Sequence, residues 1–366
     1  KIIKKKWGII MKKKIVFIVF ILFILIAGNQ FSAKKEDTNK QLYSCHNDIS
    51  YNNRYDYSQE KSLVNGEKIE LGTLVDAVYH KKRLKENNIG VAVLDTGIYP
   101  HKNLLYPKNR IIANIDFVNY IKEVYDDNGH GTAVAGIIGG KSSDLKSLEH
   151  GVCTNVNFIS VKVLDYQGKG KVEDLIRGLK WVILNRKKYN IRIVNVSMGY
   201  VAKADTEKIE KLIKKVNRKG ILVIAAAGND KKESEVLEPA NCKGVISVGS
   251  LQKIGTIYKK SIYSKCWINY QGEKKPDIYA LGENVKTLDC NVYYKGRGNN
   301  NDTIGYCYQS GTSIATAIVS GVVARIMNNH PDWSNDKVKK EMISNSIEIV
   351  KDEIDISQPI LYLRGE

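Results

Sequence analysis

Short apolar runs alternate with amphipathic segments along most of the chain from residue 89 onward. Five runs are apolar almost throughout: residues 89–95, 158–164, 191–199, 221–229 and 244–250. Continuous apolar runs of this length are typical of parallel strands that are covered on both faces. The pattern therefore predicts a buried, mostly parallel central sheet.

Amphipathic helices are predicted between these strands. The first, over residues 173–190, carries its apolar residues at helical spacing: Leu175, Ile176, Leu179, Val182 and Ile183. The second, over residues 206–219, does the same with Ile209, Leu212, Ile213 and Val216, and Gly220 follows as a stop. Strand–helix–strand alternation predicts an α/β fold, in which ligands bind beyond the carboxyl ends of the strands.

The N-terminus has the pattern of a targeting segment. Lys12–Lys14 precede thirteen apolar residues, Ile15–Ala27. This run suits the core of a signal peptide and is short for a membrane-spanning helix. We expect residues 1–33 to be a signal peptide or an N-terminal membrane anchor, and the protein to be secreted or anchored outside the cytoplasm, with membrane association through Ile15–Ala27 in the second case.

The net charge of the chain bears on which kinds of partner it could bind. The chain has 57 Lys and Arg against 39 Asp and Glu, a net charge of +18. Such an excess favours anionic surfaces, or it reflects only a solvated Lys-rich surface. No cluster of basic and aromatic residues indicates nucleic-acid binding, so no nucleic-acid partner is expected.

The six cysteines lack the close pairing of a zinc site: Cys45, Cys153, Cys242, Cys266, Cys290 and Cys307. An exported chain permits disulfides, and six buried thiols are the alternative. Cys290 and Cys307 flank a segment that has the pattern of two strands joined by a Gly/Asn-rich tip. We predict a bridge between these two.

Four polar residues stand where a predicted strand ends or a predicted buried helix begins: Asp95, His130, Asn229 and Ser313. Each alone has an ordinary structural interpretation, as a strand-end carboxylate, a helix cap or a turn residue. Together they offer an acid, an imidazole, an amide and a hydroxyl at one edge of a sheet. The backbone N–H groups at a helix start also suit an anion that forms on an attacked carbonyl.

The motifs around these residues resemble the subtilisin-like serine proteases, the subtilase family. The chain order Asp, His, Ser is that of subtilisin. The resemblance covers roughly residues 85 to 345 and is carried by VAVLDTGI, NGHGTAVAGII, SVKVLDYQGKGKVEDLIRGLKWVI, VNVSMG, VIAAAGN and SGTSIATAIVSG. It implies a three-layer α/β/α, subtilisin-like peptidase domain over residues 86–366. Residues 34–85 are then an N-terminal segment that is either a short pro-segment or a wrap of that domain.

The resemblance implies a role for each residue. Ser313 attacks the scissile carbonyl, His130 takes the proton, and Asp95 orients and stabilises the imidazole. Asn229 and the backbone N–H of Ser313 form the oxyanion hole. Two short blocks form the walls that pair with an extended peptide: Gly168, Lys169 and Gly170 on one side, and Ser197, Met198 and Gly199 on the other.

The chain also departs from the family pattern. Ala317 stands where a proline usually follows the nucleophile. Residues 141–155 do not match the usual calcium loop, and Asn103 stands near the place of an Asp ligand. No cofactor is expected for the chemistry, and structural calcium is left open. The resemblance also implies that Leu237 and Glu238, which precede Pro239, lie near the place of the floor of the first specificity pocket.

The expected function is an exported serine endopeptidase that acts on extended polypeptides, as a monomer, through an acyl-enzyme. Two alternatives remain open. One is a dedicated processing protease similar to bacteriocin leader peptidases, which would suit the unmatched calcium loop and an anchor. The other is a non-catalytic, peptide-binding pseudoprotease. Its expected signature is a lost triad residue, and the sequence keeps all three.

Overall fold

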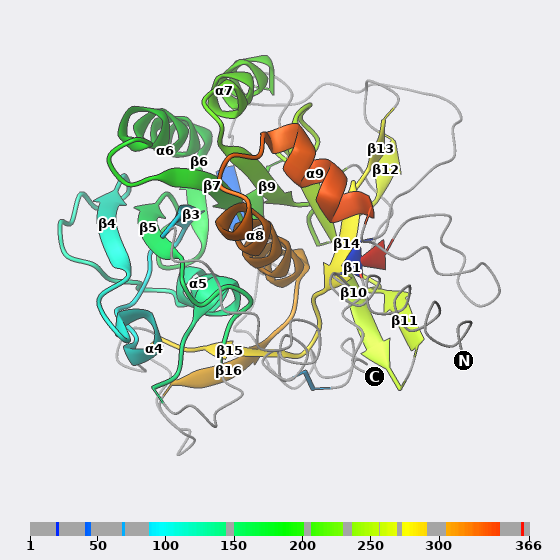
Figure 1. Ribbon diagram of the computed structural model, residues 1–366, viewed down its shortest axis with the longest axis horizontal. Helices are drawn as coiled ribbons and strands as arrows, with labels where there is room; N and C mark the ends of the chain where they lie inside the picture. The colour runs from blue at the N-terminus through cyan, green and yellow to red at the C-terminus, as the bar shows by residue number, and fades with distance from the viewer. Residues whose placement is uncertain are drawn as a thin grey trace, which may run out of the picture.

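A mostly parallel sheet forms the centre of the computed structural model, which describes residues 20–21, 41–44, 68–69, 88–143, 150–200, 206–229, 236–255, 257–268, 273–290, 305–344 and 360–361 (Figure 1). Its strand order is β1-β17-β14-β10-β9-β7-β3-β5-β4, with β11 paired to β10. The bounds are β1 Phe20–Ile21, β3 Gly90–Asp95, β4 Ile111–Asp116, β5 Asn157–Lys162, β7 Ile191–Val196, β9 Leu222–Ala226, β10 Val245–Ile254, β11 Ile257–Lys260, β14 Ile278–Leu281 and β17 Ile360–Leu361. All pairs from β17 to β4 are parallel.

Helices cover both faces of this sheet. On one face lie α5 (His130–Gly139), α8 (Thr312–Asn329) and α9 (Asn335–Ser344), and on the other α6 (Val172–Asn185) and α7 (Thr206–Arg218) (Figure 1). Alternate strand residues enter different cores, since Val91 and Val93 pack toward α5 and α8 whereas Ala92 and Leu94 pack toward α6. Both faces are therefore buried, which explains the continuous apolar runs and confirms the three-layer α/β/α prediction.

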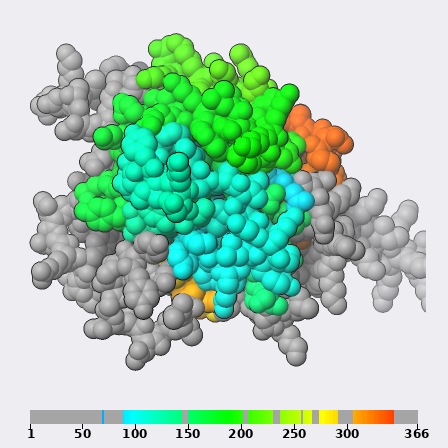
Figure 2. Space-filling model, turned by 90° about the vertical axis from the view of Figure 1, so that its left-hand side faces the viewer, coloured from blue at the N-terminus to red at the C-terminus, as the bar shows by residue number. Residues whose placement is uncertain are grey.

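The short helix α4 (Lys102–Leu105) and the edge strand β4 close one side of the molecule. Figure 2 looks onto this side, where the cyan region that includes α4 and β4 lies beneath the green region that includes α6 and α7. Smaller pairings complete the fold: β12 (Trp267–Ile268) with β13 (Lys274–Lys275), and β15 (Val285–Leu288) with β16 (Tyr306–Gln309).

The predicted bridge between Cys290 and Cys307 is wrong. Both sulfurs are thiols. The strands β15 and β16 are antiparallel, and their register places Cys307 opposite Thr287, three residues before Cys290. At about 3.3 Å per residue that offset exceeds the roughly 7 Å that a disulfide can span between Cα atoms. The predicted tip, residues 291–304, lies outside the described residues, as does Cys45.

Most of the expected targeting segment also lies outside the residues that the structure describes. Within the apolar run, Phe20–Ile21 form β1, which pairs with β17. In the described part of the chain no helix has the length and apolar character needed to cross a membrane.

Candidate active site

The edge of the sheet at which β3 ends brings Asp95 and His130 together. His130 is the first residue of α5, and its Nδ1 lies 2.7 Å from Asp95 Oδ1. Asp95 is fully buried and His130 is only 5% exposed. An ionised carboxylate can only accept, so Nδ1 carries the proton in this pair. Nε2 is then the basic nitrogen of the ring.

Asp126, which the sequence analysis did not single out, fixes the start of α5. Its Oδ1 accepts from the backbone N of Gly129 at 2.7 Å, and its Oδ2 accepts from Thr132 N at 2.9 Å. Thr96 Oγ1 donates to the same carboxylate at 2.9 Å, which links the residue after Asp95 to the helix of His130. An acid just before a helix start was the available signal, because such carboxylates cap helices.

Ser313 lies inside the first turn of α8 and does not cap the helix. The N-cap is Gly311, which has φ of 145° and makes no side-chain cap. Ser313 Oγ donates to Ser197 O at 3.1 Å, so the hydroxyl is turned toward the end of β7 and β8 (Met198–Gly199). Ala317 keeps the N–H that a proline would lack, so this turn of α8 needs no break in its hydrogen bonds.

A buried chain of hydrogen bonds joins the end of β7 to α8 at two points, Ser313 and Ser320. Ser320 Oγ donates to Asn195 Oδ1 at 2.9 Å, and Asn195 Nδ2 donates to Ser197 Oγ at 2.8 Å. Ser197 Oγ in turn donates to Ser313 O at 3.3 Å. The sequence analysis missed Asn195, although one amide inside an apolar strand was the signal. The network holds Ser313 against the strand end.

Asn229 follows β9 and is bound to the residue before Ser313. Its Oδ1 accepts from Thr312 N at 3.0 Å and from Thr312 Oγ1 at 2.9 Å. A backbone N–H can only donate, so this contact identifies the side-chain oxygen and leaves Nδ2 as the donor. Asn229 therefore offers an amide N–H beside the start of α8.

The two predicted substrate walls flank a third strand. These walls are β6 (Lys169–Lys171) and β8, and β2 (Gln41–Ser44) runs antiparallel between them. Leu42 pairs with Gly170, while Tyr43 pairs with both Lys169 and Gly199. The space between the walls thus has the width and hydrogen-bonding pattern of one extended peptide.

Leu237 fills the space behind the second wall. A Cβ added at Gly228 would lie 2.8 Å from Leu237 Cγ and Cδ1, and one at Gly199 would also meet this side chain. Next to it, burial raises the pKa of Glu238, although Cys242 Sγ donates to its Oε2 at 2.9 Å. Leu237 therefore packs tightly behind Gly199 and Gly228, with the buried Glu238 beside it.

The residues beside Asn103 do not fit a calcium ion. Ca²⁺ takes oxygen ligands such as carboxylates and backbone carbonyls, but here the Arg110 guanidinium binds the carbonyls. Arg110 Nη1 donates to Gly139 O at 2.6 Å and to Thr154 O at 3.1 Å, and Nη2 donates to Asn103 O at 2.5 Å. No cluster of three or more His, Cys, Asp or Glu that could hold a metal occurs among the described residues, which exclude 144–149 of the loop.

Comparison of the sequence with known proteins identifies its family. The subtilase family model matches residues 86–357. Serine protease AprX of Bacillus subtilis (strain 168) is 35% identical over 308 residues, which cover 79% of this chain and 67% of AprX. Minor extracellular protease Epr of the same organism is 30% identical, over 74% of this chain and 36% of Epr. The chain thus spans about two thirds of the first relative and about one third of the second.

The fold comparison agrees. The crystal structure of a cold-adapted subtilisin-like serine proteinase has a TM-score of 0.61 at 25% identity, and the match covers 79% of this chain and 93% of that one. The matching sheet, helices and sequence blocks lead to one assignment. The chain belongs to the subtilase family of serine proteases.

Proposed function

We propose that this protein is an exported serine endopeptidase that cleaves extended polypeptides with Asp95, His130 and Ser313. The observation that carries the proposal is the buried 2.7 Å contact between His130 and Asp95 at the sheet edge where α8 also begins. Export is supported by the signal-like residues 1–33 and by the similarity to an extracellular protease.

Each of the three residues has a separate role in peptide-bond hydrolysis. Ser313 Oγ attacks the carbonyl carbon of the scissile bond while His130 Nε2 takes the hydroxyl proton. Asp95 stabilises the imidazolium. The imidazolium then protonates the leaving amine, and an acyl-enzyme remains on Ser313. Water attacks this ester with His130 as the base, which releases the acid and restores the serine. The chemistry needs no metal or cofactor.

The negative oxygen of each tetrahedral intermediate would lie between Asn229 Nδ2 and the N–H of Ser313. The anchoring of Asn229 Oδ1 by Thr312 supports this role, because it leaves Nδ2 preorganised as a donor. The N-terminal end of α8 adds its favourable dipole.

The substrate would bind as the middle strand between Gly168–Gly170 and Ser197–Gly199. The chain's own β2 supports this mode, since it already pairs with both walls. We propose that residues 34–85 include a pro-segment and that β2 is the part of it that fills the groove. A peptide substrate would then replace β2, and no second copy of the chain is needed.

The test is cleavage of an unfolded polypeptide such as reduced casein by the full chain and by Ser313→Ala. We expect cleavage by the parent and none above background by the variant. Ser160→Ala is the matched control, because Ser160 is a buried serine of the same sheet whose hydroxyl makes no hydrogen bond within the described residues. Equal cleavage by parent and Ser313→Ala would contradict the proposal. Peptide binding without cleavage by the folded parent would favour the pseudoprotease, and one cleavage site in one substrate would favour the processing protease.

A further inference from the structure

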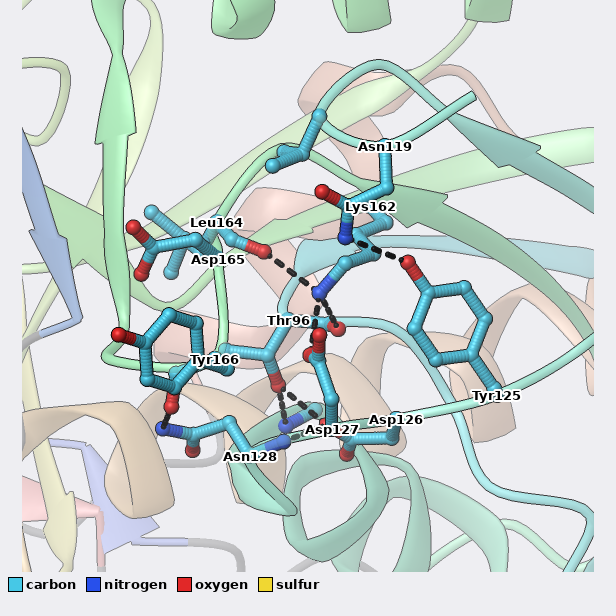
Figure 3. Close-up of polar contacts among 12 residues, drawn as sticks. Thr96, Asn119, Tyr125, Asp126, Asp127, Asn128, Lys162, Leu164, Asp165 and Tyr166 are labelled. Atoms are coloured by element: carbon cyan, nitrogen blue, oxygen red, sulfur yellow. Dashed lines mark hydrogen bonds and ion pairs between the residues drawn. The ribbon is translucent and has the colours of Figure 1, made fainter. Parts of the chain in front are cut away.

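Lys162 is a buried cation at the carboxyl end of β5. The residue is only 1% exposed. Its Nζ donates to Thr96 O at 2.7 Å, to Leu164 O at 2.8 Å and to Asp127 Oδ1 at 2.6 Å (Figure 3). An ammonium has three donors, so all of them are used. A charge buried so completely is stable only because it is paired and hydrogen-bonded.

The three acceptors belong to three different parts of the candidate site. Thr96 directly follows Asp95. Asp127 lies in the loop that leads to His130, and Leu164 begins the turn that leads to the Gly168–Gly170 wall. One ammonium group therefore connects the segment of the acid, the segment of the base and the segment that would pair with substrate.

Neighbouring contacts support this connection. Asp95 and Lys162 are partners in the register of β3 and β5. Asn128 Nδ2 donates to Tyr166 O at 3.0 Å, which links the His130 loop to the turn before the substrate wall a second time (Figure 3). The ring of Tyr125 covers the ammonium, with its centroid 5.2 Å from Nζ.

We propose that Lys162 is a positioning residue that fixes the Asp95–His130 pair relative to the substrate wall. This inference rests on the proposed protease function. Lys162 makes its contacts through backbone carbonyls and Asp127, so it acts through its neighbours without touching the substrate. A displacement of about 1 Å in an active site can reduce the rate about 100-fold. Loss of the ammonium therefore affects both the chemical step and peptide binding.

The test compares Lys162→Met with Lys275→Met. Lys275 is a matched control, because it is also a buried lysine, bound to Asp277 at 2.7 Å, and lies near the amino ends of β10 and β14. Both variants lose a buried ammonium and one ion pair. The readouts are the rate constant of Ser313 labelling by a fluorophosphonate, the labelled fraction, and kcat and KM for a peptide.

For Lys162→Met we expect the labelling rate constant and kcat to fall about 10- to 100-fold, and KM to rise. For Lys275→Met we expect a lower melting temperature and a smaller labelled fraction, but the parent's rate constants. A purely structural role of Lys162 changes the labelled fraction and leaves the rate constant alone. Rate constants for Lys162→Met within twofold of those for Lys275→Met would overturn the proposal.

Asp127→Asn tests the same connection if Lys162→Met does not fold. Its side-chain oxygen still accepts from Lys162 but carries no charge. We expect a reduction of the labelling rate constant of about threefold or more, and an unchanged rate constant would overturn the proposal. A parent that neither labels nor cleaves would instead overturn the proposed function itself, so the two failures are distinguishable.

Discussion

Two buried cations hold opposite ends of the central sheet. Arg110 precedes β4 at the amino ends of the strands, and its guanidinium binds the carbonyl oxygens of Asn103, Gly139 and Thr154. Lys162 ends β5 at the carboxyl ends, and its ammonium binds two carbonyls and one carboxylate. Both side chains gather segments that are distant in the sequence. Only Lys162 binds a residue that directly adjoins a candidate catalytic residue, because Thr96 follows Asp95.

The difference follows from the architecture of parallel sheets. Loops at the carboxyl ends of the strands converge and carry ligand-binding groups, whereas those at the amino ends serve packing. A buried cation that binds backbone carbonyls therefore has different effects on activity at the two ends of the sheet. Removing a contact at the amino end should cost stability alone, and removing one at the carboxyl end should also cost activity.

Among changes that leave Asp95, His130 and Ser313 in place, Asn229→Ala should have the largest effect at the carboxyl end. Removing one oxyanion donor in subtilisin lowers kcat about 10²- to 10³-fold, and we expect a loss of this order here. Steady-state kinetics on a peptide substrate will measure it. A loss of less than threefold in kcat would show that Asn229 does not stabilise the transition state.

The corresponding change at the amino end is Arg110→Met. It leaves buried carbonyl oxygens without their donor, which costs about 1–3 kcal/mol for each group that stays unsatisfied. Thermal unfolding should show a melting temperature several degrees lower, while kcat per labelled active site stays at the parent value. Burial lowers the pKa of Arg110 to about 10, so the test belongs at neutral pH, where the guanidinium is charged. A large fall in kcat would remove the distinction between the two ends.

Treatment with EDTA tests whether Arg110, and not a metal, holds the amino end of the sheet. Arg110 occupies the carbonyl cluster beside Asn103, so we expect no metal there. EDTA should therefore not change what this cluster contributes to the melting temperature. Any EDTA-induced fall in the melting temperature should therefore be equal in the parent and in Arg110→Met. A fall in the parent that is absent in the variant would show that a metal supports this cluster.

Leu237→Ala should change selectivity at the carboxyl end by a smaller factor. Leu237 fills the space behind Gly199 and Gly228. If these glycines line the first specificity pocket, as proposed, its truncation enlarges that pocket. We expect the preference to move about 10-fold toward substrates with a larger side chain before the cleaved bond. Profiling both proteins on one peptide library will measure the change. An unchanged profile would place Leu237 outside the pocket.

The smallest effect concerns Glu238, whose pKa is raised by burial. Above the ordinary carboxyl pKa, the folded state binds more protons than the unfolded state, so stability falls as the pH rises through the raised pKa. Glu238→Gln should therefore be more stable than the parent at neutral pH, and the difference should shrink at pH 4. Denaturant unfolding at both values tests this, and a variant less stable than the parent at neutral pH would contradict it.

The sequence predicted the scaffold better than the connections within it. All five predicted strands are present because their apolar runs are buried on both faces, although the run 191–199 divides at Ser197 into β7 and β8. Strand β4 was missed because it lies at the sheet edge and keeps a half-polar pattern, IIANID. Partial exposure at the sheet edge removes the continuous apolar run on which the prediction depends.

In the candidate site, too, the sequence identified some residues and missed others. Asp95, His130, Asn229 and Ser313 stand in short motifs, so the sequence could identify them. Arg110 and Lys162 could not be identified, because their acceptors are mostly backbone carbonyls, which every residue possesses. Only the three-dimensional arrangement shows which carbonyls a buried cation reaches.

The most direct test of the central claim is labelling of the full chain with a fluorophosphonate, followed by mass-spectrometric mapping of the adduct. An activated catalytic serine requires its base, so we predict one adduct per chain, on Ser313, and none in a folded His130→Ala variant. An adduct on a different residue, or equal labelling of parent and His130→Ala, would contradict the claim that the carboxyl end of this sheet is a working Asp–His–Ser site.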